Sequence, residues 1–127
     1  MTTSTTHLRP SETVVEHRTS VPVHFQRHGQ LRANRMKCDV ALTTERIVGT
    51  RRFGSDIQIT PDVDRSRITH VDVVETLRMR GVSRRAFKGH FLRLELEDPD
   101  TTVALLLDEA TARAWAAELT EPEASLA

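Results

Sequence analysis

Apolar and polar residues alternate along several segments of this chain, and this feature constrains the fold more than any other. Every second residue is apolar in the segments 36–42, 92–96 and 103–107, and in 71–79 apart from a break at Glu75. Successive side chains of a β-strand point to opposite faces, so each segment predicts a strand that buries one face in a core. The alternation therefore predicts a mainly β fold.

Shorter signals raise the number of expected strands to about seven. Residues 14–25 predict a first strand that is bent or bulged at Ser20–Pro22. Another strand is expected to begin at residues 47–48. The segment 57–59 predicts a short strand that ends at Pro61, because proline cannot donate a hydrogen bond to a neighbouring strand.

The segment 108–120 breaks this pattern and predicts a helix. Its apolar residues follow the spacing i, i+3, i+4, i+7 from Ala112, and Asp108 is a suitable N-cap. Trp115, the only tryptophan of the chain, lies on the apolar face. A single amphipathic helix must lie against a sheet or close the mouth of a barrel. The predicted core comprises Cys38, Val40, Leu42, Leu94, Leu105, Trp115 and Leu119.

The chain of 127 residues has the length of one domain, which we expect to span residues 13–120. Residues 1–12 are rich in Thr and Ser and predict a disordered N-terminal tail, and residues 121–127 predict a short C-terminal tail. We see no secretory signal and no run of roughly 20 apolar residues that would span a bilayer. We therefore expect a cytoplasmic protein, with peripheral attachment to a membrane as the alternative.

The hairpin sequence over residues 40–48, the segment 66–71 and the helix that carries Trp115 together resemble the pleckstrin-homology (PH) superfold. In detail the chain is similar to bacterial PH-like and GRAM-like domains over residues 13–120. The resemblance implies an antiparallel β-barrel or sandwich of about seven strands, capped by one C-terminal α-helix. It constrains function only weakly, because this superfold carries many unrelated functions.

Two basic stretches are the candidate sites for an anion or a partner. Arginine side chains hold phosphate and carboxylate groups through paired hydrogen bonds, so such stretches suit acidic ligands. The resemblance implies that they lie at the connection of the first two strands and at that of the fifth and sixth. The alternative is that both are solvated loops and strand edges. The candidate residues are Arg27, Arg32, Arg35, Lys37, Arg84, Arg85 and Lys88.

The sequence predicts neither catalytic, cofactor-binding nor metal-binding residues. Cys38 lies on the apolar side of its strand and is expected to be an inert core thiol, and as the only cysteine it forms no internal disulfide. His24 and His28 are four residues apart, but the local pattern is not helical, so they do not form a metal-ligand pair. No nucleophile-elbow or phosphate-loop sequence occurs, so we do not expect an enzyme.

The charge pattern indicates partners. The net charge is zero and the chain has no tyrosine, so nucleic acid is not expected as a partner. From Glu95 onward the chain has nine acidic residues and only one basic residue, Arg113. Basic loops of one copy can therefore contact acidic edges of another copy. We expect a non-enzymatic module for protein–protein interaction or self-assembly, through such contacts or through strand addition. The alternative is peripheral binding to anionic phospholipid headgroups.

Overall fold

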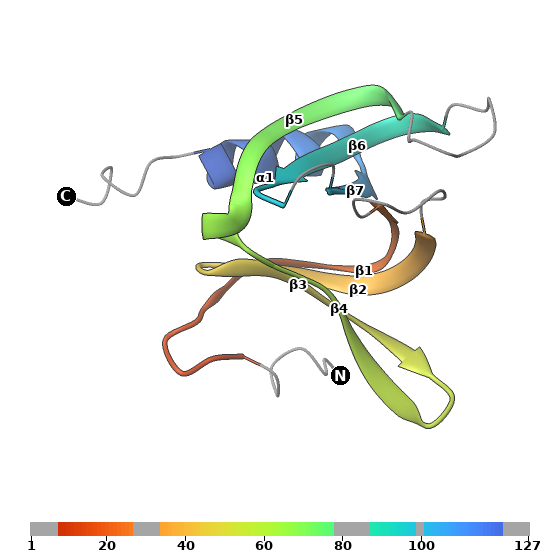
Figure 1. The fold of residues 1–127 in the computed structure, drawn as a ribbon, viewed down its shortest axis with the longest axis vertical. Coiled ribbons are helices and arrows are strands. Elements are labelled where there is room, and N and C mark those ends of the chain that lie inside the picture. The colour runs from red at the N-terminus through yellow and green to blue at the C-terminus, as the bar shows by residue number, and fades with distance from the viewer. Residues whose placement is uncertain (1–7, 27–33, 78–86, 99–100, 121–127) are drawn as a thin grey trace.

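The computed structural model describes residues 8–26, 34–77, 87–98 and 101–120. Over these residues the chain forms one antiparallel sheet of seven strands, in the order β4-β3-β2-β1-β7-β6-β5, and one C-terminal helix (Figure 1). This confirms the predicted mainly β fold with a single helix at its end. The elements are β1 (Val14–Gln26), β2 (Asn34–Thr43), β3 (Arg46–Phe53), β4 (Asp56–Asp64), a 3-10 turn (Arg65–Arg67), β5 (Ile68–Leu77), β6 (Phe87–Leu96), β7 (Thr102–Leu107) and α1 (Glu109–Thr120).

Strand β1 occupies the centre of the sheet and joins its two halves. It pairs with β2 along most of its length, and its C-terminal part also pairs with β7, with Val23 opposite Leu105. The pairing with β2 is irregular between Arg18 and Val21, and Ser20 has a φ of 52°. The bend predicted at Ser20–Pro22 is therefore confirmed, and it turns the strand from one half of the sheet toward the other.

Helix α1 packs against β5, β6 and β7, and its largest side chain lies in the core. Trp115 is only 1% exposed, and its indole Nε1 donates a hydrogen bond to Glu16 of β1. The backbone N–H of Thr111 donates to the Asp108 carboxylate at 3.1 Å, which confirms Asp108 as the N-cap. The other predicted core residues are buried, except that Leu119 is half-buried and packs against the core from its margin.

The prediction that a strand ends at Pro61 is wrong, because β4 continues to Asp64. β4 is an outer strand of the sheet, where a missing N–H is tolerated, and the ladder to β3 is irregular between Val48 and Thr50. At this irregularity a Cβ on Gly49 would lie 2.6 Å from the Thr60 carbonyl oxygen and 2.8 Å from Pro61 Cδ. Because Gly49 has no side chain, β3 leaves the space that Thr60 and Pro61 of β4 occupy.

The folded region also begins earlier than residue 13. The prediction of a disordered tail is wrong for residues 8–12, because Glu12 is buried and its carboxylate contacts Arg46 and Thr43. The partners lie more than 30 positions away, so no local pattern in the sequence indicates the contact. The remainder of the predicted tails, residues 1–7 and 121–127, lies outside the described residues. Within the described part, no helix has the length and apolar character needed to cross a bilayer.

Candidate functional site

The predicted basic residues fall partly outside the part of the chain that the structure describes, which omits Arg27, Arg32, Arg84 and Arg85. Arg35 and Lys37 lie on β2, opposite His24 and Pro22 of β1, and both are exposed. Lys88 lies on β6 opposite Thr76 and is also exposed.

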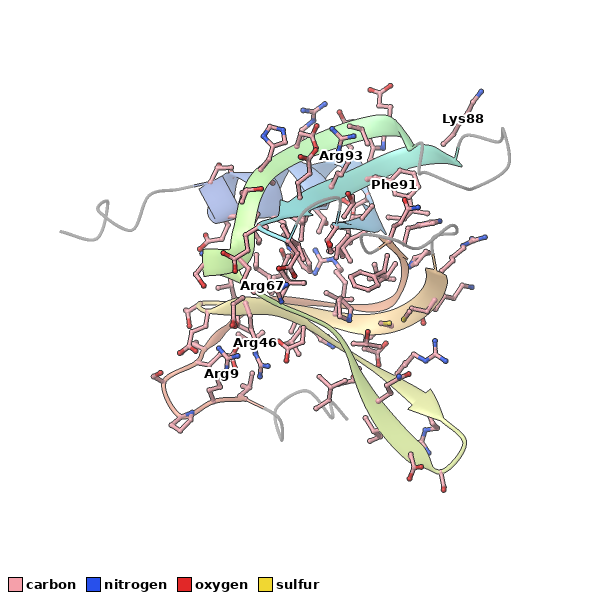
Figure 2. All side chains as sticks on the ribbon, viewed as in Figure 1. Arg9, Arg46, Arg67, Lys88, Phe91 and Arg93 are labelled. Carbon is pink, nitrogen blue, oxygen red and sulfur yellow. The ribbon has the colours of Figure 1, made fainter. Side chains whose placement is uncertain are left out.

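The described basic residues do not meet on neighbouring strands. Strands β1 and β7 separate β2 from β6, so Arg35 and Lys37 are three strands away from Lys88. In Figure 2 the side chain of Lys88 points away from the body of the molecule at the start of β6. The structure therefore places the described candidate residues on two strands that do not adjoin.

His24 lies opposite Arg35 but adds no positive charge beside it. Its side chain is buried and packs edge-on against Phe91, with the ring centroids 5.5 Å apart. Burial, and then the positive charge of Arg35, lowers the pKa of His24 below its usual value. The imidazole is therefore neutral at neutral pH and adds no charge to the surface around Arg35.

Two exposed isoleucines lie on the hairpin of β3 and β4. Beyond the irregularity at Gly49, residues 50–59 form an arm that projects from the rest of the sheet (Figure 1). On this arm, which we call the β4 arm, Ile57 is 41% exposed and Ile59 is 43% exposed. Ile57 is paired with Arg52 and Ile59 with Thr50, so both isoleucines lie on the same face.

The free edge of the β4 arm presents unused backbone groups. Among the described residues, β4 is the last strand of the sheet, with β3 on one side only. Gly54, with a φ of 64°, begins the two-residue turn between the paired residues Phe53 and Asp56. Hydrogen-bonded pairs alternate with non-bonded pairs from the turn onward, so the N–H and C=O groups of Ile57 and Ile59 point away from β3.

A cavity of about 470 Å³ lies next to this edge, between β4 and the turn from β6 to β7. Phe25, Val63 and Leu96 contribute apolar surface to it, and Ile59 connects it to the β4 arm. Arg67 at its rim forms an ion pair with Asp98, and the other acidic rim residue, Asp62, accepts two hydrogen bonds from Arg46. Each charged rim group therefore has a partner of opposite charge, and the lining combines apolar side chains with the polar side chains of Thr60 and Thr101.

A buried ion pair fixes the base of the hairpin to the start of the chain. Arg46 of β3 contacts Glu12 through its Nε at 2.8 Å and through a second nitrogen at 3.1 Å, and the Thr43 hydroxyl donates to the same carboxylate. Burial raises the pKa of Glu12, but the hydrogen bonds from Arg46, Thr43 and the N–H of Arg9 outweigh this effect and hold it at about 2. Figure 2 shows Arg46 directed toward the segment that carries Arg9.

The structure also locates the nucleophile and metal candidates. Cys38 is buried, as predicted, and burial raises the pKa of its thiol to about 11. Over the described ranges no group of three or more His, Cys, Asp or Glu side chains is arranged to hold a metal ion.

Sequence reasoning identified the segment 57–59 as a strand but missed its exposure as part of a site. The available signal is that Ile57 and Ile59 alternate with polar residues next to a turn at Gly54. The sequence does not indicate the order of strands in a sheet, so it did not identify β4 as an edge. Comparison of the chain with protein-family models, with curated proteins and with solved structures gives no match.

Proposed function

We propose that this chain is a non-catalytic, PH/GRAM-like binding module of the cytoplasm that acts through protein–protein contact at the free edge of the β4 arm. The observation that carries the proposal is the coincidence, on one projecting hairpin, of an open strand edge with two exposed isoleucines. A single solvated hairpin is only marginally stable in water, and an exposed apolar strand edge invites pairing with another chain.

Strand addition explains why these features occur together. In this binding mode the backbone of the partner pairs with the open edge and supplies affinity, while pockets for its side chains supply specificity. The backbone groups of Ile57 and Ile59 offer the pairing edge. The adjacent cavity, lined by apolar residues such as Phe25 and by polar residues such as Thr60 and Thr101, offers a site for a side chain of the partner.

The proposal is tested by photo-crosslinking in cells of the source organism. A photo-crosslinking amino acid is introduced into the full chain in place of Ile57, and separately in place of Val15, which is 48% exposed on β1. We expect protein adducts from position 57 and few from position 15, because only the first lies at the proposed edge. An absence of adducts at position 57, or equal adducts at both positions, would contradict the proposal.

Binding to anionic phospholipid headgroups is the alternative function, favoured by the exposed side chains of Arg35, Lys37 and Lys88. Each basic residue near an anionic surface contributes about 1 kcal/mol, and salt screens this contribution. Sedimentation with vesicles of phosphatidylcholine and phosphatidylserine separates the two functions. Binding that falls steeply as salt is added supports the alternative, whereas negligible binding at every salt concentration contradicts it.

A further inference from the structure

We propose that the partner at the edge of the β4 arm is a second copy of this chain, related by a two-fold axis that passes beside Gln58. In this pairing Ile57 of each copy lies opposite Ile59 of the other, so the two β4 strands run antiparallel. The inference rests on the proposed function of this edge, and adds to it the identity of the partner and the register of the contact.

The register follows from the direction of the backbone groups. In β4 the peptide groups of Ile57 and Ile59 point to the free edge, whereas those of Gln58 point toward Arg51 of β3. The N–H and C=O groups of Ile57 and Ile59 are four groups that need partners. An antiparallel strand pairs with all four only if the residues opposite Ile57 and Ile59 also direct their N–H and C=O groups across the interface. A two-fold axis beside Gln58 meets this condition, because Ile57 then exchanges two hydrogen bonds with Ile59 of the second copy, and Ile59 does the same with Ile57.

Neighbouring registers that keep the two-fold axis leave some of these four groups unpaired. An axis beside Ile57 would place Ile59 opposite Ser55, which belongs to the turn. An axis beside Ile59 would place Ile57 opposite Pro61, which has no N–H to donate. The free segment between the turn and the proline is residues 56–60, and Gln58 is its centre.

Side chains favour the same arrangement. The two isoleucines of each copy lie on one face of the β4 arm, so the pairing joins four isoleucines into a continuous apolar strip. Asp56 is the only charged residue in the segment 56–60, and it would face Thr60 rather than a second acid. The opposite outer strand, β5, carries Asp72 and Glu75, which are typical of edges protected from such pairing.

The contact between the two copies involves only residues 56–60 of each β4 strand, so we expect a weak dimer. Specific and stable complexes bury at least about 1,200 Å² of surface. A contact of five residues from each copy buries less than this. We therefore expect an equilibrium between monomer and dimer that depends on protein concentration rather than a permanent dimer.

Sedimentation velocity over a concentration series of the full chain tests the dimer. The sedimentation coefficient of the wild-type protein should rise with concentration. The substitution Ile59→Lys should weaken association by about tenfold or more, because each dimer would then place two lysine side chains in the apolar strip. The matched substitution Val15→Lys adds the same charge at another exposed apolar position and should leave association unchanged. Circular dichroism checks that both variants are folded.

Disulfide trapping tests the register without weakening the edge. Gln58 would face its own copy in a non-hydrogen-bonded pair, where the Cα atoms are about 4.5 Å apart and a disulfide can form. Under mild oxidation Gln58→Cys should give a covalent dimer. Asp56→Cys introduces a thiol on the same face of the same strand, but roughly 13 Å from its copy, and should remain monomeric. The native Cys38 is 2% exposed and does not interfere.

The outcomes separate this inference from the proposed function. A wild-type protein that stays monomeric, an association that Ile59→Lys does not weaken, or equal trapping of the two cysteine variants would overturn the two-fold pairing. If adducts from position 57 then contain a different protein, the binding function of the edge remains supported. If position 57 gives no adducts, both proposals fail.

Discussion

Glu12 illustrates how a single residue can connect distant parts of this chain. Its side chain has no exposed surface, and it accepts hydrogen bonds from Arg46 of β3 and from Thr43 of β2. Arg46 also contacts Asp62 of β4, so one network of ion pairs and hydrogen bonds joins three strands and the N-terminal segment. Removing one partner from a buried ion pair is costly, because the other charge remains buried and unpaired.

We predict that Glu12→Gln lowers the free energy of unfolding at pH 7 by about 2–3 kcal/mol. The folded-state pKa of about 2 lies below the usual value of 4.5, so this stabilisation is present above pH 4.5 and is lost as the pH falls toward 2. Urea unfolding between pH 7 and pH 2 should show a smaller loss of stability for the variant than for the wild type. Glu97→Gln, at an exposed position, is the control, and equal pH dependence for Glu12→Gln and the wild type would contradict the prediction.

At the scale of elements, α1 packs on the sheet with the face that carries its largest side chain, Trp115. Trp115 and Ala112 lie in the main core, while Arg113 on the same helix is exposed. The helix is amphipathic because Ala112, Trp115, Ala116 and Leu119 recur every three or four positions. This spacing directs these four residues to the core, on the face of α1 that packs against β5, β6 and β7.

We predict that Trp115→Ala lowers the free energy of unfolding by roughly 3–5 kcal/mol, because it leaves a cavity between α1 and the sheet. Arg113→Ala on the opposite face should change it by less than about 1 kcal/mol, since its ion pair with Glu109 is exposed. Urea titrations followed by circular dichroism give both values. Similar losses for the two substitutions would show that the position of the tryptophan in the core is misjudged.

At the scale of the whole molecule, β1 joins the two halves of the sheet. It pairs with β2 on one side and with β7 on the other, and its Glu16 also accepts the hydrogen bond from Trp115. Because the N-terminal strand lies between β2 and the C-terminal strand β7, neither half of the sheet is complete without it. Such interdependence is typical of domains that unfold in one step.

We predict that urea unfolding of the full chain is two-state. Tryptophan fluorescence reports the surroundings of Trp115 near β5, β6 and β7, whereas far-ultraviolet circular dichroism reports all strands. The two transitions should have the same midpoint and the same slope, measured at a protein concentration at which the chain is monomeric. Two separated midpoints would indicate that β1 does not couple the halves of the sheet.

Much of the local structure could be predicted from the sequence. The strands around Val40, Leu94 and Leu105 follow from alternation, and the helix follows from its spacing and its N-cap. The passage of β4 through Pro61 could not be predicted in this way, because it depends on Gly49 of the neighbouring strand. The burial of Glu12 depends likewise on partners that are distant in the sequence.

The candidate site was less predictable than the fold. The basic residues were identified because they cluster in two stretches of the sequence. In the structure, however, Lys37 and Lys88 lie on strands that do not adjoin. The β4 arm was missed because the exposure of an isoleucine depends on the position of its strand in the sheet. The residues next to the isoleucine in the sequence do not indicate that position. Ile57 and Ile59 have the same alternation as core residues such as Leu92 and Leu94.

By itself the sequence determined which segments are strands, where the helix begins, and that Trp115 belongs in the core. Those properties depend on the periodicity of apolar side chains, which is local. Tertiary structure alone decided the strand order, the burial of Glu12 and the free edge at Ile57 and Ile59. Strand order and exposure depend on which segments pair across the sheet, and backbone hydrogen bonds between strands are nearly the same for every sequence.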